Sequence, residues 1–213
     1  MDILVIGSGG REHTLVWKLA QSRSIGKIYA IPGNPGMKDI AECIYDIGVE
    51  ENKKIVDFAK DKNIGLTVIG PEIPLVNGLA NDLQAAGLPV FGPSRAAAQL
   101  EGSKSFSKAI MKKYGIPTAK YETFTDAAAA KKYIEKEGAP IVVKADGLAA
   151  GKGVIVAETI EQAMSAVDEI MRDKAFGSAG DCIVIEECLI GEEASVLAFT
   201  DGRTIVPMVP SQD

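Results

Sequence analysis

A stretch rich in lysine and glycine, KADGLAAGKGV at 144–154, has the composition of a loop that binds phosphate groups. Its two lysines, Lys144 and Lys152, can supply positive charge, and its glycine backbone can present N–H groups to an anion. The glycines are Gly147, Gly151 and Gly153. Lys144 follows three apolar residues in a strand that is predicted to be buried, where an unpaired ammonium group is costly. We therefore predict that an anionic ligand compensates the charge of Lys144.

The stretch differs from a Walker A loop, whose sequence is G-x-x-x-x-G-K-[ST]. Gly147 lies one residue too close to Gly151, and Gly153 stands where the Walker motif requires Ser or Thr. The β-branched residues VIV follow, so a strand replaces the helix whose N-terminus binds phosphate in a Walker loop. We predict a strand–loop–strand flap that folds over a polyphosphate. The alternative is a flexible hairpin with two solvated lysines.

A second glycine motif, GSGGREH at 7–13, lies between an apolar run and a helical pattern. It departs from the dinucleotide motif G-x-G-x-x-G, because Glu12 occupies the third glycine position and AIPG replaces the acidic residue expected after the second strand. NAD is therefore disfavoured. The turn can still present N–H groups and a helix dipole to an anion, and Arg11 adds positive charge. These features predict a site for a phosphate monoester, with a plain strand–helix turn as the alternative.

Two more turns, GNPG at 33–36 and GPE at 70–72, follow predicted strands. The carboxyl ends of parallel strands meet at one edge of a sheet, so these turns can line the same pocket as GSGG. Plain turns would have similar sequences. His13 is the only histidine, and no catalytic triad can be assembled around it, so we interpret it as a structural partner.

The stretch EECLIGEE at 186–193 combines acidic residues with an apolar pair. An adenine needs an apolar slot with backbone hydrogen bonds, and a ribose needs a carboxylate for its hydroxyl groups. Leu189 and Glu193 can provide these features. On its own, the pattern also fits a solvated sheet edge beside core residues.

The first hundred residues alternate short apolar runs with helical patterns. The apolar runs lie at 3–7, 27–31, 43–47, 66–70 and 88–92. The helical patterns lie at 12–22, 52–62 and 74–87. Continuous apolar runs are typical of parallel strands with helices on both faces. We therefore predict a Rossmann-like α/β domain over 1–102.

The pattern changes after residue 102. A helix is predicted over 103–115, within a linker that covers residues 103–120. The following unit, 121–187, is predicted to be a small α+β domain. Its strands are expected at 121–124, 141–145, 154–158 and 182–187, and its helices at 126–137 and 160–172. Two apolar runs around Asp201-Gly202 predict a hairpin that begins a third, truncated unit, 188–213.

The composition indicates a globular protein, because 46% of the residues are hydrophobic and 24% are charged. A net charge of −6 argues against binding to nucleic acid or to an anionic membrane surface. The N-terminal sequence predicts neither a signal peptide nor a membrane span, and the cytoplasm is the expected location. The cysteines lack metal-binding spacing and are interpreted as core residues in a reducing compartment. They are Cys43, Cys182 and Cys188.

Four segments together resemble those of ATP-grasp ligases: GSKSFSK with Lys104, IVVKADG with Lys144, the AAGKGV flap and EECLIGEEAS. With GSGGREH, GNPG, IGPE and GPS added, the whole chain resembles roughly the N-terminal half of the glycinamide ribonucleotide synthetases, also called phosphoribosylamine–glycine ligases. The resemblance implies a Rossmann-like domain, a small ATP-grasp lid domain and the beginning of an ATP-grasp core domain. It also implies ATP-dependent amide formation between glycine and phosphoribosylamine in purine biosynthesis.

The resemblance further implies roles for individual residues. Lys144 and Lys152 are the candidate catalytic residues. The residues implied in ATP binding are Lys104, Lys144, Gly147, Gly151, Lys152, Gly153, Glu186, Glu187, Leu189 and Glu193. The phosphoribosyl substrate is expected against Gly9, Gly10, Arg11, Pro71 and Glu72.

The cofactors implied are ATP and Mg²⁺ or Mn²⁺, with the metal ligands in the family's C-terminal half, beyond residue 213. Metal-assisted phosphoryl transfer needs those ligands, so we expect this chain to be an inactive N-terminal fragment of a monomeric enzyme. Small-molecule substrates are the expected partners. Two other interpretations stay open: a non-catalytic nucleotide-binding module and, less favoured, an NAD(P)-dependent oxidoreductase.

Overall fold

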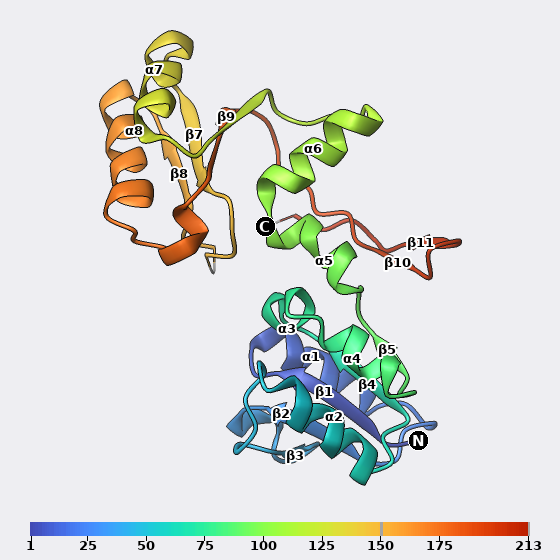
Figure 1. Cartoon of the computed structure of the whole chain (residues 1–213). Helices are drawn as coiled ribbons and strands as arrows, with labels where there is room; N and C mark the ends of the chain where they lie inside the picture. The colour runs from blue at the N-terminus through green and yellow to red at the C-terminus, as the bar shows by residue number, and fades with distance from the viewer. Residues whose placement is uncertain (150, 213) are drawn as a thin grey trace.

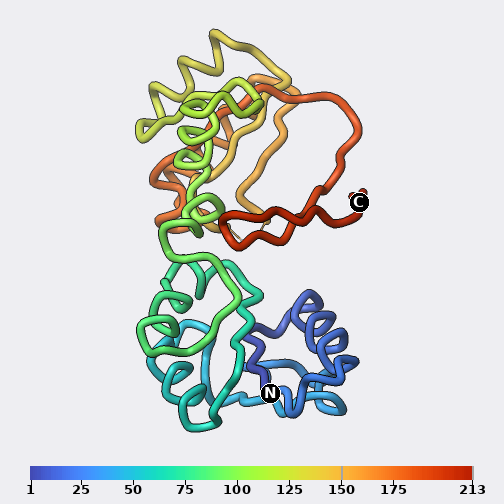
Figure 2. Tube along the Cα trace, turned by 90° about the vertical axis from the view of Figure 1, so that its right-hand side faces the viewer, coloured from blue at the N-terminus to red at the C-terminus, as the bar shows by residue number. Residues whose placement is uncertain are grey.

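The computed structural model describes residues 1–149 and 151–212 (Figure 1). It contains two lobes, joined by the helices α5 (Arg95–Gly102) and α6 (Lys104–Tyr114). Figure 2 shows the first lobe, in blue to green, below the second, with the C-terminal segment in red returning beneath the second lobe. This segment contacts the first lobe, since the ring centroids of Phe91 and Phe199 lie 5.9 Å apart.

The first lobe contains a five-stranded parallel sheet in the order β3-β2-β1-β4-β5. The strands are β1 (Ile3–Gly7), β2 (Ile28–Pro32), β3 (Glu42–Cys43), β4 (Leu66–Ile69) and β5 (Val90–Phe91). The central strand β1 is buried along its whole length. Because β2 and β4 flank β1 on opposite sides, the carboxyl end of β1 is a topological switch point, where α/β sheets bind ligands. This sheet confirms the predicted Rossmann-like fold.

Helices cover both faces of the parallel sheet (Figure 1). They are α1 (Gly10–Leu19), α2 (Asn52–Asp61), α3 (Glu72–Val76), α4 (Leu79–Ala85) and the short 3-10 turn η1 (Pro35–Met37). Val16 of α1 and Met37 of η1 pack on one face of the sheet. Ile55 of α2 and Leu83 of α4 pack on the other face. Coverage of both faces explains why the strands are continuous apolar runs.

Two local predictions in this lobe were wrong, and the helix that follows it was not predicted. The helix predicted at 74–87 is two helices, because the chain turns at Gly78, whose φ of 86° lies in the left-handed region. The strand predicted at 43–47 extends only over Glu42–Cys43, and turns follow it. The helix α5 was missed, although Ser94 is a good N-cap whose side chain accepts a 3.3 Å hydrogen bond from the N–H of Ala97.

The second lobe contains a four-stranded antiparallel sheet in the order β6-β9-β7-β8. Its strands are β6 (Tyr121–Phe124), β7 (Ile141–Ala145), β8 (Val154–Ala157) and β9 (Ile183–Glu187). Its helices are α7 (Ala127–Glu137), α8 (Ile160–Val167), the π-helical turn η2 (Asp168–Arg172) and the 3-10 turn η3 (Gly177–Gly180). Both α7 and α8 lie on one face of the sheet (Figure 1), where Ile134 and Ile170 pack with Val143 and Ile185.

The last described segment carries a two-stranded antiparallel hairpin, β10 (Ala198–Thr200) and β11 (Ile205–Pro207). Its turn lies at the predicted Asp201-Gly202, and the Asp201 carboxylate accepts hydrogen bonds from the N–H groups of Arg203 and Thr204 at 2.9 and 2.7 Å. These bonds confirm the predicted hairpin.

Asp213, the last residue of the predicted third unit, lies outside the described residues. Within the described part of the chain, no helix has the length and apolar character needed to cross a membrane.

Candidate functional site

The strands β7 and β9 place two charged side chains on the sheet face opposite α7 and α8. Successive strand residues point to opposite faces, and Val143 and Ile185 belong to the helix-covered core. Their neighbours Lys144 and Glu186 therefore face the other way, toward α6, which contacts β9. The alternation of β7 thus explains how a lysine stands in an otherwise apolar strand.

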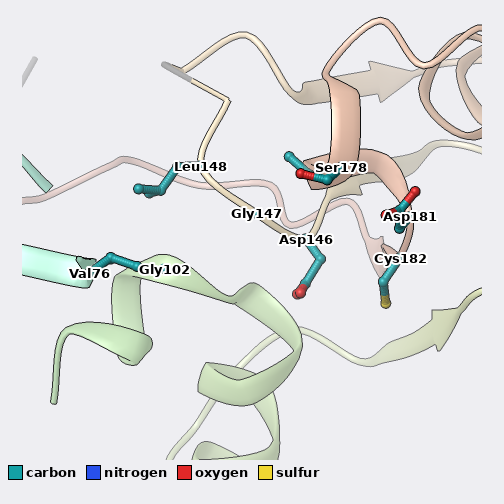
Figure 3. Close-up of a pocket in the computed structure, with 9 residues that line it drawn as sticks. Val76, Gly102, Asp146, Gly147, Leu148, Ser178, Asp181 and Cys182 are labelled. Atoms are coloured by element: carbon teal, nitrogen blue, oxygen red, sulfur yellow. The ribbon is translucent and has the colours of Figure 1, made fainter. Parts of the chain in front are cut away.

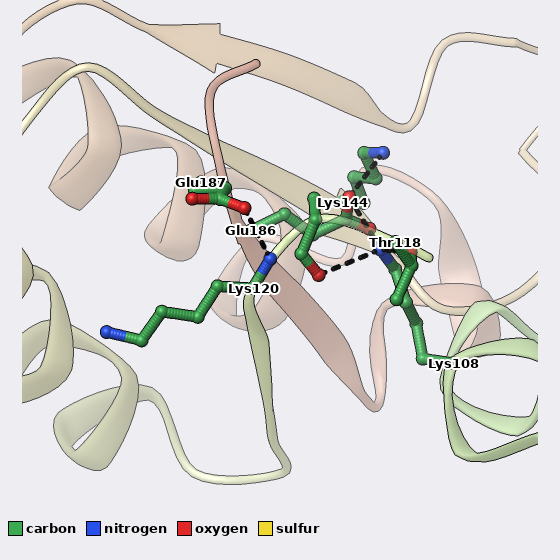
Figure 4. Close-up of polar contacts among 7 residues, drawn as sticks. Lys108, Thr118, Lys120, Lys144, Glu186 and Glu187 are labelled. Carbon is green, nitrogen blue, oxygen red and sulfur yellow. Dashed lines mark hydrogen bonds and ion pairs between the residues drawn. The ribbon is translucent and has the colours of Figure 1, made fainter. Parts of the chain in front are cut away.

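Glu186 binds two lysines through a single carboxylate oxygen (Figure 4). Its Oε2 lies 3.0 Å from Nζ of Lys108 and 3.1 Å from Nζ of Lys144. Glu186 is 6% exposed and Lys108 is 8% exposed, whereas a quarter of the Lys144 side chain is exposed. A carboxylate of the chain itself therefore supplies the negative charge that the sequence analysis assigned to a ligand.

Lys104 is held between the start of α6 and the base of the glycine loop. Its Nζ donates a 3.1 Å hydrogen bond to the carbonyl of Gly147, and its backbone N–H donates to the carbonyl of Asp146. The Asp146 carboxylate accepts hydrogen bonds from Ser105 N–H at 2.6 Å and from the Ser103 hydroxyl at 3.0 Å. Burial lowers the pKa of Lys104 below its ordinary value, and neighbouring Asp146 and Glu101 only partly offset this effect.

The glycine loop joins β7 to β8, as predicted, and its residue Ala150 lies outside the described residues. The N–H of Gly147 donates to Ala179 at 3.2 Å, so this amide is engaged within the chain. Gly151 has a left-handed φ of 76°, and a Cβ on Gly153 would lie 2.6 Å from that of Ala149. Backbone conformation and close packing therefore require glycine at these two positions.

A cavity of about 820 Å³ brings the glycine loop together with the carboxyl edge of the parallel sheet. Its lining residues are Arg11, Glu72, Ile73, Glu101, Lys104, Leu148, Ala149, Gly151, Gly153 and Val154. A smaller cavity, about 310 Å³, is lined by Lys104, Lys108, Lys144 and Glu186 among others. Lys104 lines both cavities. The exposed Lys152 is not among these lining residues.

A third cavity, about 400 Å³, lies at the base of the glycine loop (Figure 3). Its walls include Asp146, Leu148 and Cys182. Figure 3 shows the Asp146 carboxylate directed toward the helical segment that begins α6, in agreement with its hydrogen bonds to Ser103 and Ser105. Asp146 therefore fixes the loop base to the helix that carries Lys104.

The predicted substrate residues lie together at the carboxyl edge of the parallel sheet. Arg11 pairs with Glu72 at 2.8 Å, next to the exposed Gly9 and Gly10 and after Pro71. The Glu72 carboxylate raises the pKa of Arg11. Burial opposes ionisation of Glu72, but hydrogen bonds from its own backbone and from Arg11 outweigh burial and lower the pKa of Glu72. The pair connects the N-terminus of α1 with the N-terminus of α3.

The turn GNPG belongs to the same edge. The side-chain amide of Asn34 donates a 2.9 Å hydrogen bond to the carbonyl of Ser8, which joins the second turn to the first. His13 packs against this turn, since a Cβ on Gly36 would lie 2.8 Å from its Cε1 atom. These contacts match the structural role predicted for His13.

Glu12 is a residue whose position the sequence analysis noted without assigning it a role. It is 4% exposed, and its Oε2 accepts a 2.7 Å hydrogen bond from the N–H of Gly9. Its Oε1 is buried and has no hydrogen-bond partner among the described residues. The side chain fills the space that Gly7 and Gly70 leave open. The sequence signal for this residue was an acidic side chain at the third glycine position of a G-x-G-x-x-G pattern.

The side chains of the segment EECLIGEE lie in different environments. Glu186 faces the lysines, whereas Glu187 accepts a 2.8 Å hydrogen bond from the N–H of Lys120, the residue before β6. Leu189 is 69% exposed and Glu193 is also exposed, and neither lines the three cavities described above.

Among residues 1–149 and 151–212, no group of three or more His, Cys, Asp or Glu side chains could hold a metal ion.

The second lobe, in which Lys144 and the lysines of α6 line one cavity, is an ATP-grasp domain. Residues 102–213 match the family described as phosphoribosylglycinamide synthetase, ATP-grasp (A) domain, and residues 1–101 match its N domain. The chain belongs to the phosphoribosylglycinamide synthetase family.

Relatives of known name agree with this assignment. The chain is 54% identical to a phosphoribosylamine–glycine ligase of Halalkalibacterium halodurans and 56% identical to one of Nostoc sp., covering 100% of this chain and 50% of each relative. A crystal structure of phosphoribosylamine–glycine ligase from Thermotoga maritima is similar with a TM-score of 0.76 and 31% identity, over 99% of this chain and 49% of that one. The chain thus spans about half the length of the curated relatives it matches.

Proposed function

We propose that the whole protein carrying this chain is an ATP-dependent carbon–nitrogen ligase. It joins glycine to 5-phosphoribosylamine and forms glycinamide ribonucleotide, ADP and phosphate in de novo purine biosynthesis. The observation that carries this proposal is the 820 Å³ cavity, which is lined both by Lys104 with the glycine loop and by Arg11 at the sheet edge. One cavity that serves a polyphosphate and a phosphate monoester is what such a ligase requires.

The chemistry proceeds through an acyl phosphate. A carboxylate oxygen of glycine attacks the γ-phosphorus of ATP, and ADP leaves. The amine nitrogen of phosphoribosylamine then attacks the acyl carbon, and inorganic phosphate leaves. Both steps develop negative charge on phosphate oxygens, which positioned cations stabilise. Lys144 and Lys152 are our candidates for this catalytic role.

The nucleotide is assigned to the cavities beside β7, β9 and the glycine loop. Lys104 and Lys144 bind the phosphates, and the loop from Gly147 to Gly153 covers them. The backbone from Glu186 to Leu189 binds adenine, and Glu193 binds the ribose hydroxyls. For Leu189 and Glu193 this assignment requires the exposed segment to close on the nucleotide, because neither lines a cavity described above.

The phosphoribosyl substrate is assigned to the edge formed by Gly9, Gly10, Arg11, Pro71 and Glu72. The N-terminus of α1 opens there, and helix N-termini favour anions. Arg11 supplies a cation, although its charge is shared with Glu72 at 2.8 Å. Support for this assignment comes from the position of the edge at the switch point of the sheet.

Mg²⁺ accompanies ATP in the proposed reaction and would neutralise phosphate charge. We assign no metal ligand to this chain and propose that the ligands lie in the family's C-terminal half, beyond residue 213. We also propose that the whole protein is cytoplasmic and monomeric. Within this chain we place the domain boundaries after residues 102, 120 and 187.

A substrate-omission assay tests the proposal. ADP release by the whole protein should require ATP, glycine and phosphoribosylamine together, and omission of either acceptor substrate should reduce it to background. ADP release that does not depend on the amine would contradict the proposed ligase. Binding of ATP without any turnover would favour the alternative of a non-catalytic nucleotide-binding module.

A further inference from the structure

Lys108 is a buried cation that the proposed reaction does not use. It lies one helical turn after Lys104 on α6, and it is 8% exposed. Its Nζ contacts Glu186 at 3.0 Å, donates to the Thr118 hydroxyl at 2.7 Å, and lies 5.4 Å from the centre of the Tyr121 ring. A buried lysine carries a large desolvation cost unless its environment supplies such partners. The structure therefore fixes Lys108 from three sides.

We propose that Lys108 and Glu186 are positioning residues for Lys144, an inference that rests on the proposed binding of ATP. Lys108 fixes the Glu186 carboxylate, and the same carboxylate oxygen holds Nζ of Lys144 at the wall of the 310 Å³ cavity. Lys144 is the more exposed of the two lysines, with a quarter of its side chain accessible. It is therefore the lysine that reaches the phosphate groups.

The charges explain why this arrangement keeps Lys144 available. Two ammonium groups share one carboxylate oxygen, so one positive charge of the cluster is left over for a ligand. Lys108 has further partners in Thr118 and Tyr121, whereas Glu186 is the one hydrogen-bond partner found for the Lys144 side chain among the described residues. Lys108 is therefore the fixed member of the cluster, and Lys144 is the lysine that can turn its remaining N–H donors toward a polyphosphate while Glu186 holds it.

The position of α6 gives the cluster a further role. Residues four apart lie on the same helix face, so α6 presents Lys104 and Lys108 side by side. Lys104 reaches the base of the glycine loop directly, through the Gly147 carbonyl. Lys108 reaches Lys144 through Glu186. One helix thereby sets the positions of both lysines that the proposed function assigns to phosphate.

One variant separates positioning from simple charge attraction. Glu186→Gln removes a negative charge beside the cavity, so charge attraction alone predicts tighter binding of ATP. Positioning predicts weaker binding, because Lys144 loses its charged anchor. Lys108→Met leaves the Glu186 carboxylate without its fixed partner, so positioning predicts weaker binding of ATP; loss of a cation predicts the same, and Glu186→Gln is the variant that decides. Lys108→Arg keeps the charge and the pairing, and should recover most of the affinity.

The experiment measures equilibrium binding of ATP and of adenosine to the whole protein by calorimetry. Because the cluster acts on phosphate, we expect both Glu186→Gln and Lys108→Met to weaken ATP binding by about tenfold or more, with the adenosine affinity nearly unchanged. The matched control is Lys112→Met, an exposed lysine on the same helix, which should bind ATP as the parent does.

Equal or tighter binding of ATP by Glu186→Gln, with an unchanged adenosine affinity, would overturn the inference. If Lys108→Met does not fold, the comparison of Glu186→Gln with Lys108→Arg decides, because both retain polar partners in the buried cluster. A parent protein that binds no ATP would instead contradict the proposed function itself, so the two failures are distinguishable.

Discussion

The side chain of Glu12 occupies the space in which a side chain at Gly70 would have to lie. A Cβ on Gly70 would overlap Cγ and Oε1 of Glu12, and would lie 2.7 Å from its Cδ. Glu12 also binds the N–H of Gly9 at 2.7 Å. One buried carboxylate therefore holds the turn after β1 against the turn after β4, the two turns that carry the proposed substrate residues.

This contact predicts a specific coupling between positions 12 and 70. Overpacking should make Gly70→Ala destabilising by about 1–3 kcal/mol in the free energy of unfolding. In a Glu12→Ala background the same change should cost clearly less, with a coupling energy of about 1 kcal/mol or more. Denaturant unfolding of the four proteins measures the cycle. The control is Gly10→Ala, since a Cβ there meets no atom within 4 Å. If the effects of Glu12→Ala and Gly70→Ala on the free energy of unfolding simply add, the Glu12 side chain is not the reason for glycine at position 70.

A second prediction concerns Asp146, which caps α6 from another part of the chain. Because its carboxylate accepts hydrogen bonds from Ser103 and Ser105, Asp146→Ala should lower the free energy of unfolding by about 1–3 kcal/mol. Amide exchange of Ser105 and Phe106 should accelerate, whereas Asp146→Asn, which keeps one acceptor, should show a smaller effect. Unchanged exchange at both amides in Asp146→Ala would refute the capping role.

The lowered pKa of Lys104 predicts a pH dependence of nucleotide binding. Burial lowers this pKa, so Lys104 loses its proton at a lower pH than an ordinary lysine. The charged form binds phosphate, and affinity for ATP should therefore fall as the pH rises through the lowered pKa. Lys104→Arg stays charged, and its decline should begin at a higher pH. Calorimetric titrations over the alkaline range measure both profiles, and identical profiles would contradict the assigned contact.

Arg11 is expected to bind the phosphate of the second substrate. Arg11→Met should weaken binding of ribose 5-phosphate to the whole protein by about tenfold, because a charge-assisted hydrogen bond is lost. Binding of ribose should change little. Arg23→Met provides the matched control, as Arg23 is an exposed arginine of the same lobe. Equal losses in both variants would point to general charge attraction instead of a specific site.

The fold class could be predicted from the sequence, because short apolar runs such as 3–7 and 141–145 mark strands that are mostly buried. The sequence also indicated that Lys144 stands in a buried strand. It did not reveal that Glu186 compensates Lys144, since this pair depends on the antiparallel register of β7 and β9. Contacts between residues 42 positions apart are set by that register and not by local pattern.

Lys108 was missed for a related reason. Within GSKSFSKAIMKKYG it is one of four lysines with helical spacing, and such residues are commonly solvated. Its burial follows from the docking of α6 on the open face of the second sheet, which no local pattern encodes. The break at Gly78, by contrast, had a local signal in the glycine itself.

We propose that the loop between β7 and β8 closes on a triphosphate and donates its own amides to it. Hydrogen exchange of the Gly151 and Gly153 amides in the whole protein tests this claim, with Gly87 of the first lobe as an internal control. The account predicts that saturating ATP with Mg²⁺ slows exchange at both loop glycines, whereas adenosine does not. Exchange at Gly151 and Gly153 that stays the same with saturating ATP would contradict it.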